Sequence, residues 1–154
     1  MVIGGLGGSG TRVYAVALRD AGVDMGRLFN AALDNLVFTA LFKRPRWFAT
    51  AGDPAVRRHL ATFTRYSRDR PFTPADLTRL GRVIVDHDPT VGRRESAERV
   101  RAAFARRPRA ERRRAPAWGW KEPNSHLFLP QLIDHYPGLR FVYVTRHGLD
   151  MAYS

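Results

Sequence analysis

A glycine-rich segment at residues 4–10, with the sequence GGLGGSG, constrains the fold of this chain more than any other feature. It follows the apolar pair Val2 and Ile3, and it precedes residues 11–20, whose composition predicts a helix that ends at Gly22. An apolar run, a glycine turn and a helix in that order predict a strand–turn–helix unit. Because such a unit aims backbone N–H groups and the positive end of a helix dipole at one point, the segment predicts an anion site.

A second signal of the same kind lies near the other end of the chain. Residues 140–145 (RFVYVT) are the clearest strand in the sequence, apolar enough for a buried parallel strand, and they lead into Arg146 and a further helix start. Ser154 follows Arg146 by eight residues, just over two helical turns, so we expect both on one side of that helix. Two anion sites predict a ligand with two separated anionic groups.

The order of strands and helices predicts an α/β fold with a parallel sheet and flanking helices. We expect one domain over residues 1–154, with a helical insertion at 50–115 that precedes a strand at 117–121. A sheet of three strands would leave parallel edges unpaired, and the chain stops shortly after its last strand. We therefore expect the sheet to be incomplete at the C-terminus.

Helix-breaking and helix-capping residues mark where the other helices should lie. The first helix should bury Val13, Tyr14, Ala17 and Leu18 on one face. Further helices are expected over residues 28–42, 54–68, 74–87 and 93–107, and after a cap at Asn124 or Ser125. Trp47 and Phe48, which follow Pro45, are expected in the core.

Composition excludes several classes of protein. The 154 residues, 44% of them hydrophobic, suffice for one core, and the absence of cysteine excludes disulfides, thiolate metal sites and a cysteine nucleophile. No run approaches the roughly 18 apolar residues of a membrane span, and no export signal is visible. We therefore expect a cytoplasmic protein with no membrane span, and we leave its oligomeric state open.

The formal net charge of +12 would attract nucleic acid, acidic glycans or anionic nucleotides, and it does not choose among them. The densest basic run, residues 93–114, also contains Glu95, Glu98 and Glu111, which favours a solvated helix face over a nucleic-acid-binding arm. No nucleic-acid partner is therefore expected, and a basic nucleic-acid-binding protein stays as an alternative.

The glycine loop departs from the phosphate loop of ATP-dependent enzymes, G-x-x-x-x-G-K-[ST]. Thr11 stands in place of the lysine and Arg12 in place of the magnesium-binding hydroxyl, and the best strand ends in Arg146 rather than in an aspartate. Residues 83–86 (VIVD) keep an ATP-dependent phosphotransferase as an alternative, although their spacing favours a helix. No metal site is expected, because the adjacent residues 86–88 (DHD) would rarely point to one ion.

Three segments together resemble the sulfotransferases that use 3'-phosphoadenosine 5'-phosphosulfate. They are the loop at 7–12 (GGSGTR), the segment at 120–124 (WKEPN), and Arg146 with Ser154. The resemblance implies a P-loop NTPase-like sulfotransferase fold with a helical insertion. It also implies transfer of a sulfuryl group, without a metal, from this nucleotide to a hydroxyl or amine of a small-molecule, glycan or peptide acceptor.

In that family the first loop holds the 5'-phosphosulfate, and the later arginine and serine hold the 3'-phosphate. The resemblance therefore implies nucleotide-binding roles for Gly7, Gly8, Ser9, Gly10, Thr11, Arg12, Arg146 and Ser154.

The catalytic groups follow from the same resemblance. Many members carry a lysine or arginine where this chain has Gly8, and there it stabilises the bridging oxygen. Lys121, which resembles a family lysine in a Lys-x-Pro segment, and Arg12 are the candidates for the missing cation. Asp34 is the expected base, placed on the second helix, because related members carry an acidic residue soon after the first helix. His126 is the second candidate base.

Overall fold

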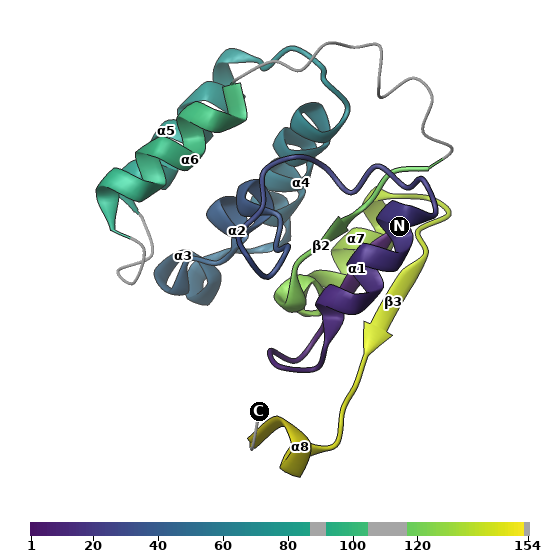
Figure 1. Ribbon diagram of the computed structural model, residues 1–154. Coiled ribbons are helices and arrows are strands. Elements are labelled where there is room, and N and C mark those ends of the chain that lie inside the picture. Colours follow the sequence, from purple (N-terminus) through teal and green to yellow (C-terminus); the bar gives the residue numbers. More distant parts are fainter. Residues whose placement is uncertain (87–91, 105–116, 153–154) are drawn as a thin grey trace. The chain divides into compact units, whose positions relative to one another are not determined.

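The structure, a computed structural model, divides the chain into two compact units (Figure 1). The described residues are 1–86, 92–104 and 117–152. The bounds are Met1–Asn35 with Ala110–Ser154 for the first, here called the sheet unit, and Leu36–Arg109 for the second, the helical unit. The helical unit overlaps the helical insertion expected at 50–115.

The sheet unit is built on a three-stranded parallel sheet with the order β2-β1-β3. The strands are β1 (Val2–Gly5), β2 (Trp120–Lys121) and β3 (Phe141–Val144). In the register, Ile3 pairs with Lys121, and Gly5 pairs with Val144. This confirms the expected α/β fold with a parallel sheet and flanking helices, and it puts the carboxyl ends of β1 and β3 side by side.

Helices cover both faces of this sheet. Ile3 points to one face, where it packs with Ala15 of α1 (Thr11–Asp20). Trp120 points to the other face, because successive side chains on a strand alternate. There its Nε1 donates to Ser125 Oγ of the 3₁₀ helix η2 (Pro123–Phe128) at 3.1 Å. η2 leads into α7 (Leu129–His135), and the last described helix is α8 (Gly148–Ala152).

The helix α1 has the expected bounds but not the expected buried face. Val13 and Tyr14 are 69% and 49% exposed, whereas Thr11 and Ala15 are buried. The helix begins directly after the glycine turn, so the turn sets which residues meet the sheet. Small side chains at Thr11 and Ala15 let the helix approach the strands closely, and Leu18 packs partly buried beside them as expected.

The second expected helix begins later than the sequence predicts. The helix α2 is Leu36–Phe42, and the residues before it form a turn instead of the first part of a helix at 28–42. In this turn Asn30 Oδ1 accepts from the backbone N–H groups of Ala32 and Asp34 at 3.0 and 2.9 Å. Such local bonds compete with helical ones, and Leu33 adopts a left-handed φ of 64° that also ends any helix.

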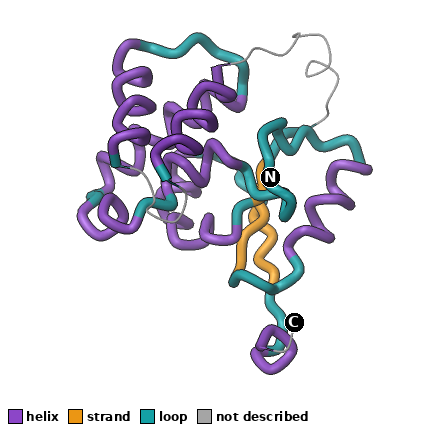
Figure 2. Tube along the Cα trace, turned by 60° about the vertical axis from the view of Figure 1, so that its left-hand side comes forward, coloured by secondary structure: helices purple, strands orange, loops and turns teal. Residues whose placement is uncertain are grey.

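In its described residues, the helical unit consists of helices joined by loops (Figure 2), and it has its own aromatic core. After α2 it contains α3 (Pro45–Thr50), α4 (Asp53–Ser67), α5 (Pro74–Val85) and α6 (Arg93–Phe104). Phe38 stacks on Phe42 at 4.3 Å between ring centroids and meets the edge of Phe63 at 5.2 Å. Trp47 packs partly buried against this core, 5.8 Å from Phe42, but Phe48 is 47% exposed, so its expected place in the core is wrong. The short helix α3 turns it outward.

Candidate functional site

The glycines of the first loop fall into two groups with different roles. A Cβ at Gly4 would lie 2.6 Å from Phe141 Cζ, and one at Gly5 only 2.3 Å from Val144 O, so these two allow close packing. In contrast, a Cβ at Gly7 or Gly10 would meet no heavy atom of the described residues within 4 Å. The outer part of the loop is therefore open, and its backbone is accessible to a ligand.

The loop ends at the start of α1 with backbone donors that no side chain covers. Gly10 is the N-cap, with a φ of 88°, and no side chain of the described residues caps the helix there. The N–H of Val13 donates back to Gly10 O at 3.0 Å, as the first helical turn requires. An uncapped first turn next to an open glycine loop suits an anion.

Ser9 provides an independent sign of a ligand in this loop. Its side chain is 6% exposed, and its Oγ has no hydrogen-bond partner among the described residues. A buried hydroxyl without a partner costs about 1–3 kcal/mol. A ligand oxygen in the loop would remove that cost. Thr11 is also buried, whereas Arg12, the second residue of α1, is exposed.

The second anion signal lies at the same edge of the sheet. Because Gly5 pairs with Val144, the loop after β1 and the segment after β3 leave adjacent strand ends. Arg146 lies in that segment, with its side chain 42% exposed and its Nε 4.0 Å from Asp150 Oδ2. A Cβ at Gly8 would lie 4.0 Å from Met151 Cε, which places α8 beside the glycine loop. Ser154 lies outside the described residues.

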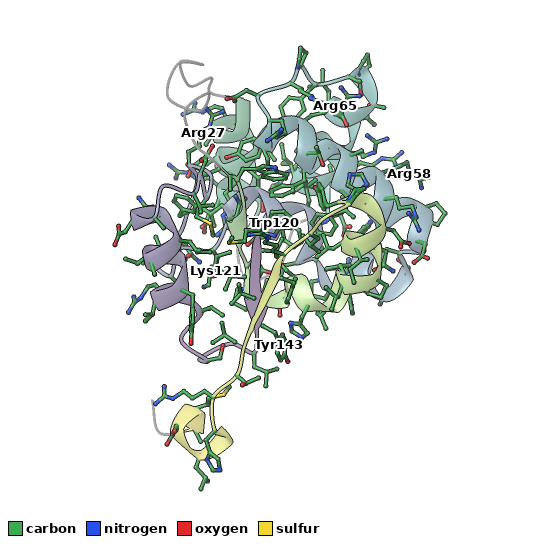
Figure 3. All side chains as sticks on the ribbon, turned by 90° about the vertical axis from the view of Figure 1, so that its right-hand side faces the viewer. Arg27, Arg58, Arg65, Trp120, Lys121 and Tyr143 are labelled. Carbon is green, nitrogen blue, oxygen red and sulfur yellow. The ribbon has the colours of Figure 1, made fainter. Side chains whose placement is uncertain are left out.

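Two of the candidate catalytic residues are in direct contact. Lys121 lies on β2 (Figure 3) and is 3% exposed. Its Nζ donates to Ala32 O at 3.0 Å and to the carboxylate oxygen Asp34 Oδ1. As the register partner of Ile3, Lys121 points to the face that α1 covers. Asp34 lies in the turn before α2 rather than on a helix, which corrects its expected position.

Sequence reasoning missed Asn30, which holds Asp34 in place. Its Nδ2 donates to Asp34 Oδ2 at 2.9 Å, while its Oδ1 accepts the two backbone N–H bonds of the turn. Asparagine favours such turns, and that preference was the signal available in the sequence. The contact with the Asp34 carboxylate required the folded turn.

His126, the second candidate base, is separated from this pair. Its Nδ1 lies 2.8 Å from Pro123 O, so Nδ1 carries the proton, and its ring meets the edge of Tyr143 at 5.7 Å. Tyr143 and η2 lie on the sheet face opposite to Lys121. The structure therefore brings Asp34, and not His126, to Lys121.

A second buried polar cluster, in the helical unit, is closed by its own contacts. Arg44 is buried, and it donates to Asp86 Oδ2 at 3.0 Å, to Leu41 O and to His59 Nε2 at 3.0 Å. His59 Nδ1 donates to Ala55 O at 2.9 Å, which fixes the neutral tautomer. Burial, together with the charges of Arg44 and nearby arginines, lowers the pKa of His59 to about 4. This cluster joins the ends of α3 and α5 to α4.

Two observations bear on the alternative functions, an ATP-dependent phosphotransferase and a nucleic-acid-binding protein. Residues 83–86 belong to the end of α5 and its C-cap, so no described strand ends in the aspartate that a magnesium-dependent phosphotransferase would use. Within α6, Arg94 pairs with Glu98 on an exposed face, as expected for a solvated helix, whereas the Arg99 that pairs with Glu95 is only 16% exposed. Residues 87–91 and 105–116 lie outside the described residues. They include positions 87 and 88 of the DHD segment and positions 105–114 of the basic run.

Comparisons of the chain with protein-family models, curated proteins and solved structures found no match. Over the described residues, no group of histidine and acidic side chains could hold a metal ion. No helix in the same part of the chain is long and apolar enough to cross a membrane.

Proposed function

We propose that this chain is a sulfotransferase domain with a P-loop NTPase-like fold. It would transfer a sulfuryl group from 3'-phosphoadenosine 5'-phosphosulfate to a hydroxyl or amine of a small-molecule, glycan or peptide acceptor. The observation that carries the proposal is the pairing of Gly5 with Val144, which brings two anion-binding segments to adjacent strand ends. A nucleotide with an anionic group at each end matches that arrangement.

The glycine loop fits the 5' end of the donor. The residues in question are Gly7, Gly8, Ser9, Gly10, Thr11 and Arg12. Open space over Gly7 and Gly10 leaves room for a phosphosulfate. The buried Ser9 Oγ has no hydrogen-bond partner in the described part of the chain, and a phosphate oxygen would supply one. The uncapped start of α1 and the exposed Arg12 add positive charge there.

Arg146 fits the 3'-phosphate at the other end of the nucleotide. A guanidinium can bind a phosphate through two parallel hydrogen bonds. Arg146 is exposed, and among the described residues its one ion pair is a long contact with Asp150. Ser154 is proposed as its partner from the resemblance alone.

The Lys121–Asp34 pair supplies the catalytic groups of the proposal. The bound donor would provide an electrophilic sulfuryl group, so the protein needs a base for the acceptor and a cation for the leaving oxygen. Asp34 would take the acceptor proton. Among the described residues, two oxygen atoms accept from the Lys121 ammonium, and its third N–H is left to stabilise the leaving oxygen. Arg12 is the alternative source of that charge.

Calorimetric binding of adenosine 3',5'-bisphosphate tests the proposal. Arg146→Ala should weaken binding about 10- to 100-fold, because a hydrogen bond to a charged group contributes about 1.5–3 kcal/mol. Ser9→Ala should weaken it less, since its hydroxyl is neutral. The matched control is Arg140→Ala, which removes an exposed arginine before β3, at the opposite edge of the sheet, and should leave the affinity unchanged.

Three results would contradict the proposal. Equal affinities of the wild type and the three variants for the bisphosphate would rule out both proposed anion sites. Binding of Mg-ATP without binding of the bisphosphate would favour the phosphotransferase. Tight, salt-dependent binding of DNA that is unaffected by both loop and Arg146 substitutions would favour a nucleic-acid-binding protein.

A further inference from the structure

The turn that carries Asp34 is more elaborate than a connection between two elements requires. Leu33 has a left-handed φ of 64°, a conformation that is costly for a bulky residue. The Leu33 side chain packs against the sheet-unit core, and the N–H of Asn35 donates to Lys121 O at 2.7 Å. Because several contacts enforce this strained backbone, the turn holds Asp34 in one position against Lys121.

Asn30 makes the contacts that complete this arrangement. Two of them, from the N–H groups of Ala32 and Asp34 to Oδ1, fix the backbone of the turn. The third, from Nδ2 to Asp34 Oδ2, contributes nothing to the backbone and acts only on the carboxylate. Lys121 binds the other carboxylate oxygen, so the two residues together fix the rotation of the Asp34 side chain.

We propose that Asn30 is a positioning residue that orients the Asp34 carboxylate. This inference rests on the proposed role of Asp34 as the base. The amide N–H of Asn30 occupies only one lone pair of Asp34 Oδ2. The Asp34 side chain is 20% exposed, so the remaining lone pairs can receive the proton of an acceptor hydroxyl.

A purely structural role would need only the acceptor oxygen of Asn30. Aspartate at this position keeps that oxygen for both backbone N–H groups, and it replaces the donor with a second carboxylate beside Asp34 Oδ2. Serine also keeps an acceptor for the turn, and it removes the donor without adding charge. Asn30→Asp and Asn30→Ser therefore separate the effect on the turn from the effect on the carboxylate.

The experiment measures the rotamer of the Asp34 side chain in the full chain by NMR, from the three-bond couplings between its carboxyl carbon and the backbone. The carboxyl signal is assigned by its loss in Asp34→Asn. The wild type should show the couplings of one rotamer, and Asn30→Asp and Asn30→Ser should shift them toward an average over several rotamers, because the amide donor to Oδ2 is lost. The matched control is Asn124→Asp, which changes an equivalent amide–carboxylate contact, Asn124 Nδ2 to Glu122 Oε1 at 3.0 Å, and should leave the Asp34 couplings unchanged.

Asp34 couplings in Asn30→Asp and Asn30→Ser that match the wild type would overturn the inference. The same change in Asn124→Asp as in Asn30→Asp would also overturn it, because the effect would then not be local. The affinity for adenosine 3',5'-bisphosphate is measured on the same proteins and should stay within a factor of two. If the wild type fails to bind the bisphosphate, the proposed function fails, while the couplings still decide whether Asn30 positions Asp34.

Discussion

Two buried polar side chains, one in each unit, differ in where their hydrogen-bond partners lie. In the helical unit, Asp76 of α5 is buried, and it accepts from Thr62, Thr73 and Arg79, so its oxygens are used within the protein. In the sheet unit, Ser9 Oγ is buried without a partner among the described residues. The difference indicates that a buried polar group serves the fold where its partners are internal, and is available to a ligand where they are not.

Removal of the Asp76 carboxylate should have the largest effect on the free energy of unfolding. Burial alone would raise the pKa of Asp76, but hydrogen bonds from Thr62 and Thr73 and the charge of Arg65 hold it below the usual range. Asp76→Ala leaves these buried donors without an acceptor and should lower the free energy of unfolding by about 3–4 kcal/mol. Urea denaturation measures this.

Asp53→Ala is the matched control for Asp76→Ala. Asp53 also lies in the first turn of its helix, α4, but it is exposed, so its loss should cost at most about 1 kcal/mol. Similar small losses in both variants would show that the Asp76 network is not a structural element of the helical unit.

The next effect in size is the pH dependence that His59 confers. Its pKa is about 4 in the folded protein and 6.5 in the unfolded chain, so the unfolded state binds the extra proton first as the pH falls. The contribution of His59 to stability is therefore complete above pH 6.5 and should be lost, by about 2–3 kcal/mol, as the pH falls to about 4.

Urea denaturation at several pH values between 7 and 4 measures this loss. His59→Gln keeps a side chain that can donate to Ala55 O or accept from Arg44, but it cannot titrate. The difference between wild type and variant should therefore change across this range. A wild-type profile parallel to that of His59→Gln would contradict the prediction.

The smallest effect on stability is expected for Ser9→Ala, which is compared with Ser125→Ala. Ser9→Ala removes a hydroxyl that has no hydrogen-bond partner among residues 1–86, 92–104 and 117–152, so without ligand it should leave the stability unchanged or raise it by up to about 1 kcal/mol. Ser125→Ala removes a buried hydroxyl that accepts from Trp120 and should lower the stability by about 1–3 kcal/mol. Thermal unfolding of both variants measures the difference. A destabilised Ser9→Ala would mean that Ser9 Oγ serves the fold.

Local features of the sequence predicted much of the sheet unit. The glycine turn and Gly22 gave the bounds of α1, and an apolar run gave β3. The buried face of α1 could not be predicted, because helical periodicity shows which residues share a face but not which face meets the sheet. The start of α2 was missed, since Asn30 stabilises a turn within an otherwise helical pattern.

The sequence predicted which residues form the candidate site, but it did not predict which of them are in contact. Lys121 and Asp34 were chosen separately, 87 positions apart, and they meet because the turn bonds to β2, where the N–H of Asn35 donates to Lys121 O at 2.7 Å. The turn preference of Asn30 did not predict its contact with Asp34, and no pattern predicted the contact of Arg44 with His59 and Asp86. Such clusters arise from long-range packing, which composition and spacing do not encode.

Gly5 has a consequence for any ligand of this edge, although it is not proposed to touch one. Its α-carbon faces Val144 O so closely that even a methyl group would force β3 away from β1. The width of the gap between these two backbones sets how far apart the loop and Arg146 stand. For the proposed ligand, which would bridge the two segments, this glycine would limit the length that fits, and its replacement should change the affinity without removing a proposed binding group.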